Sequence, residues 1–335
     1  MTTLWPACLV AGSVAVSAWV GGDVTLAESA TGASPSGVIR DPGQIVGPDA
    51  CAECHENEHR VWMGSAHQAG AQTLTRNAEA KRIAKALGVR RIKADARCAS
   101  CHFTVQQAQG KRAKSISGVS CESCHSAGAG WIDPHSQFGE GADSPRDETG
   151  QHRAERYQYC ESMGMIHPAR LYKLASACYS CHMITDGELI EVGGHPTGDG
   201  FDLVCWSQGD IRHNFVREGA DNNPESSPQR RRVMFLIGST VRLEFAIRAA
   251  DSDGSYGPLL AAIGHLEDIE SARSVEVVSE LIEIGKGVES SAGADHAGAI
   301  ERVREIGESI EMEQIGSDVE EIDALIPAVV TRGDR

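Results

Sequence analysis

The pentapeptide Cys-x-x-Cys-His occurs four times in this chain, and no other feature constrains the fold as strongly. The copies read CAECH, CASCH, CESCH and CYSCH, at residues 51–55, 98–102, 121–125 and 178–182. With 11 Cys and 13 His among 335 residues, random placement would give on the order of 0.01 copies. The repeated motif therefore reflects a chemical requirement.

The spacing suits covalent attachment of haem c. Two thiols three positions apart can each form a thioether with one vinyl group of a haem, and the adjacent histidine supplies an axial imidazole to the iron. The sequence thus predicts four haem c groups. The predicted attachment residues are Cys51, Cys54, Cys98, Cys101, Cys121, Cys124, Cys178 and Cys181. The predicted proximal iron ligands are His55, His102, His125 and His182.

Zinc and redox sites are the alternative interpretations of these motifs. A zinc ribbon uses Cys-x-x-Cys pairs two at a time and does not require a histidine after each pair. A thioredoxin-like site needs a single Cys-x-x-Cys at the start of a helix in a βαβ unit. Neither requirement accounts for four copies of Cys-x-x-Cys-His, so haem attachment is favoured.

The first 27 residues resemble an export signal. An apolar stretch from Trp5 to Val20 precedes small residues such as Ala27, but no Lys or Arg precedes that stretch. An uncleaved membrane anchor and a buried N-terminal helix are the alternatives. Haem is attached to such motifs outside the cytoplasmic membrane, so a periplasmic location is expected, with a membrane anchor only if the segment is retained.

Composition and charge divide the rest of the chain. Residues 28–46 are small, polar and punctuated by Pro and Gly, which predicts a linker. Residues 47–215 contain all four motifs and are predicted to form a tetrahaem domain. Residues 250–335 hold 20 acidic and 6 basic residues, and so supply −14 of the net charge of −16. We expect a mainly α fold with little regular sheet, followed by an acidic helical bundle over residues 230–330.

Local patterns predict individual helices. Ala299, Val303, Ile306 and Ile310 share one face of a helix near residues 297–313. Ser317 and Glu320 form a possible capping box for another helix. The segment 71–88 has apolar residues at near-helical spacing and ends at a glycine. Eight basic residues fall between residues 76 and 97, and they form either a solvated helix face or a docking face for an acidic partner.

Two longer stretches resemble a known family. CAECHENEHRVWMGSAH, followed by GVSCESCHSAGAGWIDPH, is similar to the tetrahaem cytochrome c-554 family, which pairs Cys-x-x-Cys-His with a downstream Trp-x-x-x-x-His and carries a Gly-Val-x-Cys-Glu-Ser-Cys-His third motif. The resemblance covers about residues 47–215. It implies an electron carrier between redox proteins, with a hydroxylamine-oxidising enzyme as a possible donor and another carrier or a membrane quinone or cytochrome complex as acceptor.

The resemblance also implies second axial ligands for three irons. By position it pairs His135 with His55, His67 with His182, and His213 with His125. From the residues alone, each of the three added histidines is also compatible with a polar side chain near a loop.

The second haem is the exception, because the family pattern leaves it without a distal protein ligand. Here GGHPTGDGF offers His195, either as a ligand opposite His102 or as a turn histidine before Pro196. Outside the motifs, Cys160 and Cys205 are expected to form a disulfide or to remain two buried thiols.

The main functional prediction is therefore a periplasmic electron-transfer protein without catalytic residues. The alternative is a haem enzyme that reduces nitric oxide or a related small oxide at an open second haem. A third interpretation makes the chain a subunit of a redox assembly, with its acidic bundle binding a basic partner. No nucleic-acid partner is expected.

Overall fold

The protein is mainly helical, as predicted. The computed structural model describes residues 38–209, 212, 225–291, 293 and 295–329, so the expected export signal and His213 lie outside the described residues. Within these ranges the strands are β1 (Thr104–Gln106) and β2 (Lys114–Ser117), which pair antiparallel as one short hairpin. None of the described helices is both long and apolar enough to cross a membrane.

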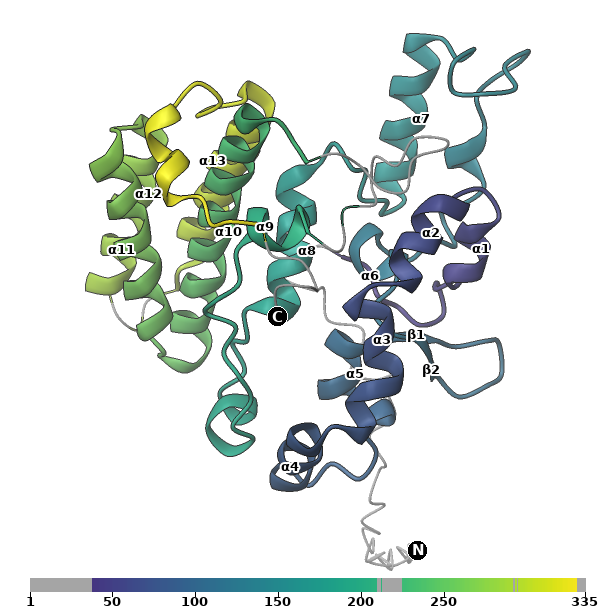
Figure 1. The fold of residues 1–335 in the computed structure, drawn as a ribbon, viewed down its shortest axis with the longest axis horizontal. Helices are drawn as coiled ribbons and strands as arrows, with labels where there is room; N and C mark the ends of the chain where they lie inside the picture. Colours follow the sequence, from purple (N-terminus) through teal and green to yellow (C-terminus); the bar gives the residue numbers. More distant parts are fainter. Residues whose placement is uncertain (1–37, 210–211, 213–224, 292, 294, 330–335) are drawn as a thin grey trace, which may run out of the picture.

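Short helices carry the four motifs (Figure 1). In chain order the α-helices are α1 (Pro48–Ala52), α2 (Glu56–Met63), α3 (Ala66–Thr73), α4 (Ala78–Ala86), α5 (Ala96–His102), α6 (Cys121–His125), α7 (Gly150–Ser162), α8 (Leu171–His182) and α9 (Leu203–Ser207). Between them lie the 3-10 turns η1 (Leu74–Arg76), η2 (Ile92–Ala94) and η3 (Pro134–Ser136) and the π-helical turn η4 (Glu188–Val192).

Longer helices form the C-terminal part. They are α10 (Pro228–Asp253), α11 (Gly257–Ala272), α12 (Glu276–Ser290) and α13 (Ala297–Glu313), followed by the 3-10 turn η5 (Glu320–Leu325). Ser227 caps α10 by accepting the backbone N–H of Arg230, and Gly254 ends it in the left-handed conformation. Because α10 contacts α8, α11 and α13, it is apolar around most of its circumference.

The helix that carries the fourth motif shares its core with the C-terminal helices. Leu171, Tyr172 and Tyr179 of α8 belong to the same buried cluster as the apolar residues of α10 to α13. The Tyr172 hydroxyl also donates to the fully buried carboxylate of Glu244 on α10, at 2.5 Å. The C-terminal helices therefore support the helix that carries the fourth motif. The division into two domains stays a prediction.

The structure confirms one predicted helix and contradicts two other local predictions. The helix at 297–313 is confirmed, with Val303, Ile306 and Ile310 buried. The helix over 71–88 is wrong as one element, because the Asn77 side chain caps a new helix, α4, by accepting the Ala80 N–H. The capping box at residue 317 is also wrong, since the following turn begins after Val319 without a side-chain cap.

Candidate haem-attachment sites

Local helical structure brings the two cysteines of a motif together. The third motif spans α6, while α5 and α8 end at the histidines of the second and fourth motifs. Residues three apart lie on the same face of a helix. Both thiols of each of these motifs can thus reach one bound group.

Three of the motif histidines each lie opposite a second histidine. The ring centroids are 6.2 Å apart for His55 and His135, 6.0 Å for His67 and His182, and 6.2 Å for His102 and His195. An imidazole nitrogen binds a metal at about 2.0 Å and lies about 1.1 Å from its ring centre, so two rings that share one metal have centroids about 6.2 Å apart. All three separations match the space that a six-coordinate haem iron needs.

Hydrogen bonds orient several of these imidazoles. Nδ1 of His125 lies 2.9 Å from the carbonyl oxygen of Ile166, and Nδ1 of His195 lies 2.9 Å from that of Pro196. His135 makes the same kind of contact with Ile132. A ring that donates from Nδ1 to a carbonyl keeps Nε2 for a metal.

Burial favours the neutral form of four of the paired imidazoles. It lowers the pKa of His67, His102 and His135, and it lowers the pKa of His182 to about 4, with further contributions from His67 and His102. A metal binds the neutral form of imidazole. The donor sets therefore fit haem iron in chemistry as well as in spacing.

A close backbone contact positions His67. The indole N–H of Trp62 donates to the carbonyl oxygen of Val119 at 2.7 Å, which ties α2 to the segment before the third motif. A Cβ on Gly118 would lie 2.1 Å from the carbonyl oxygen of His67, so only glycine allows this approach. These contacts explain the Trp-x-x-x-x-His spacing and the glycine before the third motif.

The loop that carries His195 is held at both ends. Arg82 on α4 donates to the carbonyl oxygen of Gly194 at 3.2 Å, and Arg97 on α5 forms an ion pair with Glu188 at 3.3 Å. Gly198, at φ 85°, packs so tightly that a Cβ would lie 1.8 Å from the His182 carbonyl oxygen. The loop is thereby fastened to the second and fourth motifs.

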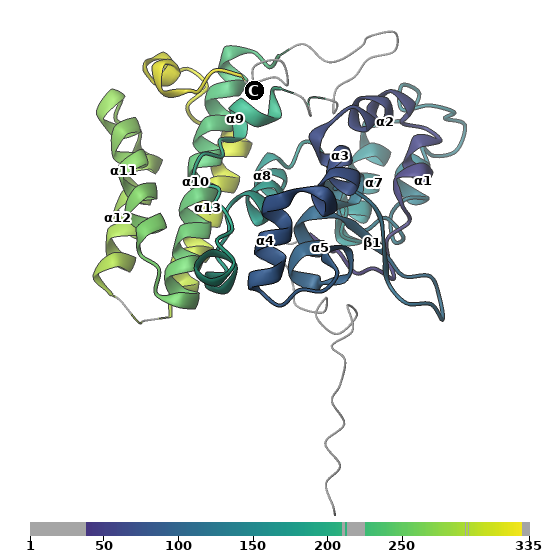
Figure 2. The ribbon, with the colours of Figure 1, turned by 60° about the horizontal axis from the view of Figure 1, so that its bottom comes forward.

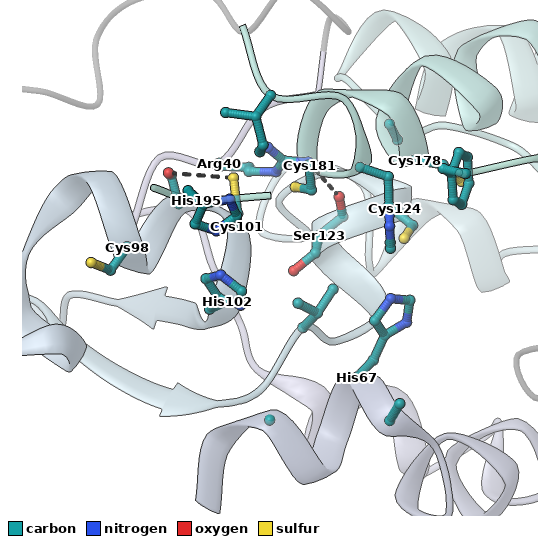
Figure 3. A pocket seen from close by; sticks show the side chains of 18 of the residues that line it. Arg40, His67, Cys98, Cys101, His102, Ser123, Cys124, Cys178, Cys181 and His195 are labelled. Atoms are coloured by element: carbon teal, nitrogen blue, oxygen red, sulfur yellow. Dashed lines mark hydrogen bonds between the residues drawn. The ribbon is translucent and has the colours of Figure 1, made fainter. Parts of the chain in front are cut away.

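The four motifs line two cavities. The second and fourth motifs surround one cavity together with His67, His195 and the third-motif residues Ser123 and Cys124 (Figure 3). Its apolar wall includes Ile83, Ile184, Leu189, Phe201 and Trp206. The first and third motifs line another cavity. Thiols of different motifs also influence each other, because the neighbouring Cys181 raises the pKa of Cys101 and the neighbouring Cys51 raises the pKa of Cys121.

Arg40 occupies the junction of three motifs, although it falls in the segment expected to be a linker. Its Nη2 donates to the carbonyl oxygen of Ser123 at 3.1 Å and to the hydroxyl of Ser180 at 3.0 Å. Figure 3 shows it beside Cys101 and Cys181. Ser123 and Ser180 are interior residues of the third and fourth motifs, so Arg40 joins them. Nothing in the local sequence indicates this role.

Glu122, inside the third motif, is also structural. Its carboxylate is fully buried and accepts the backbone N–H groups of Val46 at 2.9 Å, Gly47 at 2.8 Å and Gly128 at 2.7 Å. Three charge-assisted hydrogen bonds compensate the burial of the charge. Glu122 thus holds the backbone just before the first motif, at residues 46–47, close to the backbone just after the third motif, at residue 128.

Of the two alternatives for Cys160 and Cys205, the structure shows two separate buried thiols. Cys160 packs with Trp131 and Met165, whereas Cys205 lies on α9; both are buried and are not bonded to each other. Among the described residues, no group of three or more Cys, His, Asp or Glu side chains has the arrangement of a metal site formed by the chain alone. The zinc interpretation gains no support from this.

Comparisons with known proteins agree with the motifs. Residues 50–126, which include the first three motifs, match the family model described as cytochrome c554 and c-prime. A curated relative, cytochrome c-554 of Nitrosomonas europaea, is 29% identical over 146 residues, which is 35% of this chain and 60% of the relative. No solved structure gives a significant match. Residues 50–126, which carry the first three motifs, are thus similar to the cytochrome c-554 family of c-type cytochromes, and the chain spans 60% of the length of the relative that it matches.

Proposed function

We propose that the protein is an exported cytochrome that holds four haem c groups and passes electrons between redox partners. The observation that carries this proposal is the pairing of three motif histidines with second histidines at the spacing of one six-coordinate iron. His213 is proposed as the corresponding ligand for the third motif. The eight motif cysteines would form the thioether bonds.

The side chains do what such a carrier requires. Bound haem irons would supply one-electron couples. Histidine pairs drawn from separate segments would cross-link the fold and would hold each iron with the same two imidazoles in both oxidation states. Apolar side chains such as Phe201, which stacks on the His182 ring at 4.4 Å, exclude water. In such a site, the protein and solvent would reorganise little when the iron changes its oxidation state.

His195 bears on the alternative function. Reduction of nitric oxide or a related oxide would require an open distal position on the second haem, and His195 lies at ligand spacing from His102. The carrier is therefore the better supported function, and no residue is assigned a catalytic role.

Location and partners complete the proposal. Haem attachment outside the cytoplasmic membrane points to the periplasm, with residues 1–27 as a cleaved signal or an anchor. The donor and acceptor would be redox proteins, a hydroxylamine-oxidising enzyme or a membrane quinone or cytochrome complex among them.

The test is to express the full chain in a host with active cytochrome maturation. A pyridine haemochrome assay is expected to give four haems per chain, and electron paramagnetic resonance of the oxidised protein should show only low-spin iron. A high-spin signal from one haem would favour the enzyme instead. Fewer than four haems would contradict the stated cofactor content.

A further inference from the structure

We infer that the surface around the second motif is a docking face for an acidic redox protein, and that electrons enter or leave the chain there. This inference rests on the proposed function and adds the site and the charge of the partner. The term basic face denotes the exposed cations of α4, η2 and the segment between them: Lys81, Lys85, Arg90, Arg91 and Lys93.

The charge of this region opposes that of the chain. Residues 76–117 contain 11 basic and 2 acidic residues, an excess of nine positive charges in a protein whose net charge is −16. The hairpin that continues the face is attached to it, because the hydroxyl of Ser115 donates to the carbonyl oxygen of Lys93 at 2.7 Å. Lys111, Arg112 and Lys114, also exposed, lie at and beside the hairpin turn.

These charges are available to a partner. Among the described residues, none of the five cations of the basic face forms an ion pair, whereas Arg82 and Arg97 beside them pair with Glu79, Asp95 and Glu188. An unpaired exposed cation keeps its full attraction for an approaching anion. The acidic residues on the adjoining loop, including Glu191, reduce the excess without removing it.

The second motif lies within this face. α5, which ends at His102, follows η2 directly, and Lys93 lies over the ring of Phe103 at 5.6 Å. The loop that presents His195 contributes Val192, an apolar side chain that is 56% exposed. Apolar contact surrounded by positive charge is a usual composition for a transient interface.

The rest of the charge would orient the partner. The acidic α11 and α12 lie at one end of the molecule, with α10 and α13 between them and α4 (Figure 2). An acidic protein is therefore repelled by α11 and α12 and attracted by the basic face. Screening over about 8 Å at physiological salt confines this attraction to close approach, so the basic face determines where docking occurs.

The experiment measures reduction of the oxidised holocytochrome by reduced flavodoxin, used as a defined acidic redox protein. Each encounter transfers one electron from the flavin to a haem iron. The variant is Lys81→Glu with Lys85→Glu and Arg91→Glu. The matched control is Arg60→Glu with Arg146→Glu and Lys173→Glu, three exposed cations outside the basic face, which changes the net charge equally.

The basic-face variant is expected to lower the second-order rate constant about tenfold at low ionic strength, with the difference lost at high salt. The control variant should keep a second-order rate constant close to that of the unmodified protein. Equal rates in all three proteins, or equal losses in both variants, would overturn the inference while leaving the carrier intact. If the unmodified holoprotein accepted no electron even from dithionite, the proposed function itself would fail.

Two further measurements identify other occupants of the face. Binding of the unmodified protein to phosphatidylserine vesicles, lost in the basic-face variant while flavodoxin rates are unchanged, would assign the face to a membrane. Salt-sensitive self-association, abolished by the same variant without a change in rate, would assign it to the acidic bundle of a second copy. Either result replaces the proposal.

Discussion

In the proposed carrier, a single histidine would decide the coordination of the second haem. His195 is held opposite His102 by a loop fastened to α4 and α5. His195→Ala is expected to convert one haem of the four to a high-spin form that binds carbon monoxide, because the distal position loses its ligand. The measurement is carbon monoxide titration followed by optical spectroscopy. His265→Ala, in the bundle, should leave the spectrum unchanged, and an unchanged spectrum in the first variant would exclude His195 as a ligand.

Glu122 determines how stable the third motif is. Glu122→Ala leaves three buried N–H donors without acceptors and is expected to reduce the free energy of unfolding by about 3 kcal/mol or more. Glu122→Gln keeps one acceptor oxygen and should cost less, about 1–3 kcal/mol. Urea unfolding of the holoprotein checks both values. Equal stability of all three proteins would show that the carboxylate is not needed.

Arg40 places a positive charge among three attachment sites. A cation nearby stabilises the reduced iron relative to the oxidised iron, because reduction removes one positive charge from the centre. Arg40→Gln is therefore expected to lower the reduction potential of at least one haem by about 59 mV, a tenfold change for one electron. Spectroelectrochemical titration measures this. Arg60→Gln, on the exposed face of α2, is the control. Equal reduction potentials in the two variants would exclude the proposed effect of Arg40.

At the scale of elements, the approach of α3 to the third motif determines where His67 lies. Gly118→Ala would force a Cβ against the His67 carbonyl oxygen, so the start of α3 must move. We expect weakened ligation opposite His182, seen as a new high-spin signal in electron paramagnetic resonance. Gly70→Ala, in the same helix with open space around it, should keep the spectrum and stabilise the helix by about 0.5–1 kcal/mol.

Helix boundaries were predictable where one local pattern dominated. The spacing of apolar residues indicated α13 correctly because that helix buries one continuous face. Residues 71–88 have a similar spacing, but Asn77 competes for the backbone by capping α4 and breaks the predicted helix in two. Propensity and periodicity alone do not decide between these outcomes.

At the scale of the whole molecule, helix α8, which contains the fourth motif, and the acidic bundle share one core. Tyr172→Phe removes the hydroxyl that bonds Glu244 and leaves a buried carboxylate less satisfied, so a loss of about 1–3 kcal/mol is expected. Soret absorption and far-ultraviolet circular dichroism should show coincident unfolding transitions at lower denaturant. Tyr159→Phe, at an exposed tyrosine, is the control. Separate transitions would show that the bundle unfolds independently.

The sequence by itself indicated haem c as the cofactor and predicted its attachment cysteines and proximal histidines, because thioether formation and proximal ligation involve only five consecutive residues. The resemblance to the cytochrome c-554 family added candidate distal histidines to this prediction. Only the tertiary structure decided that His135, His67 and His195 lie opposite three motif histidines, and that Arg40 and Glu122 join the motifs. These contacts connect segments up to 140 residues apart, and only the packing of the whole chain sets such distances.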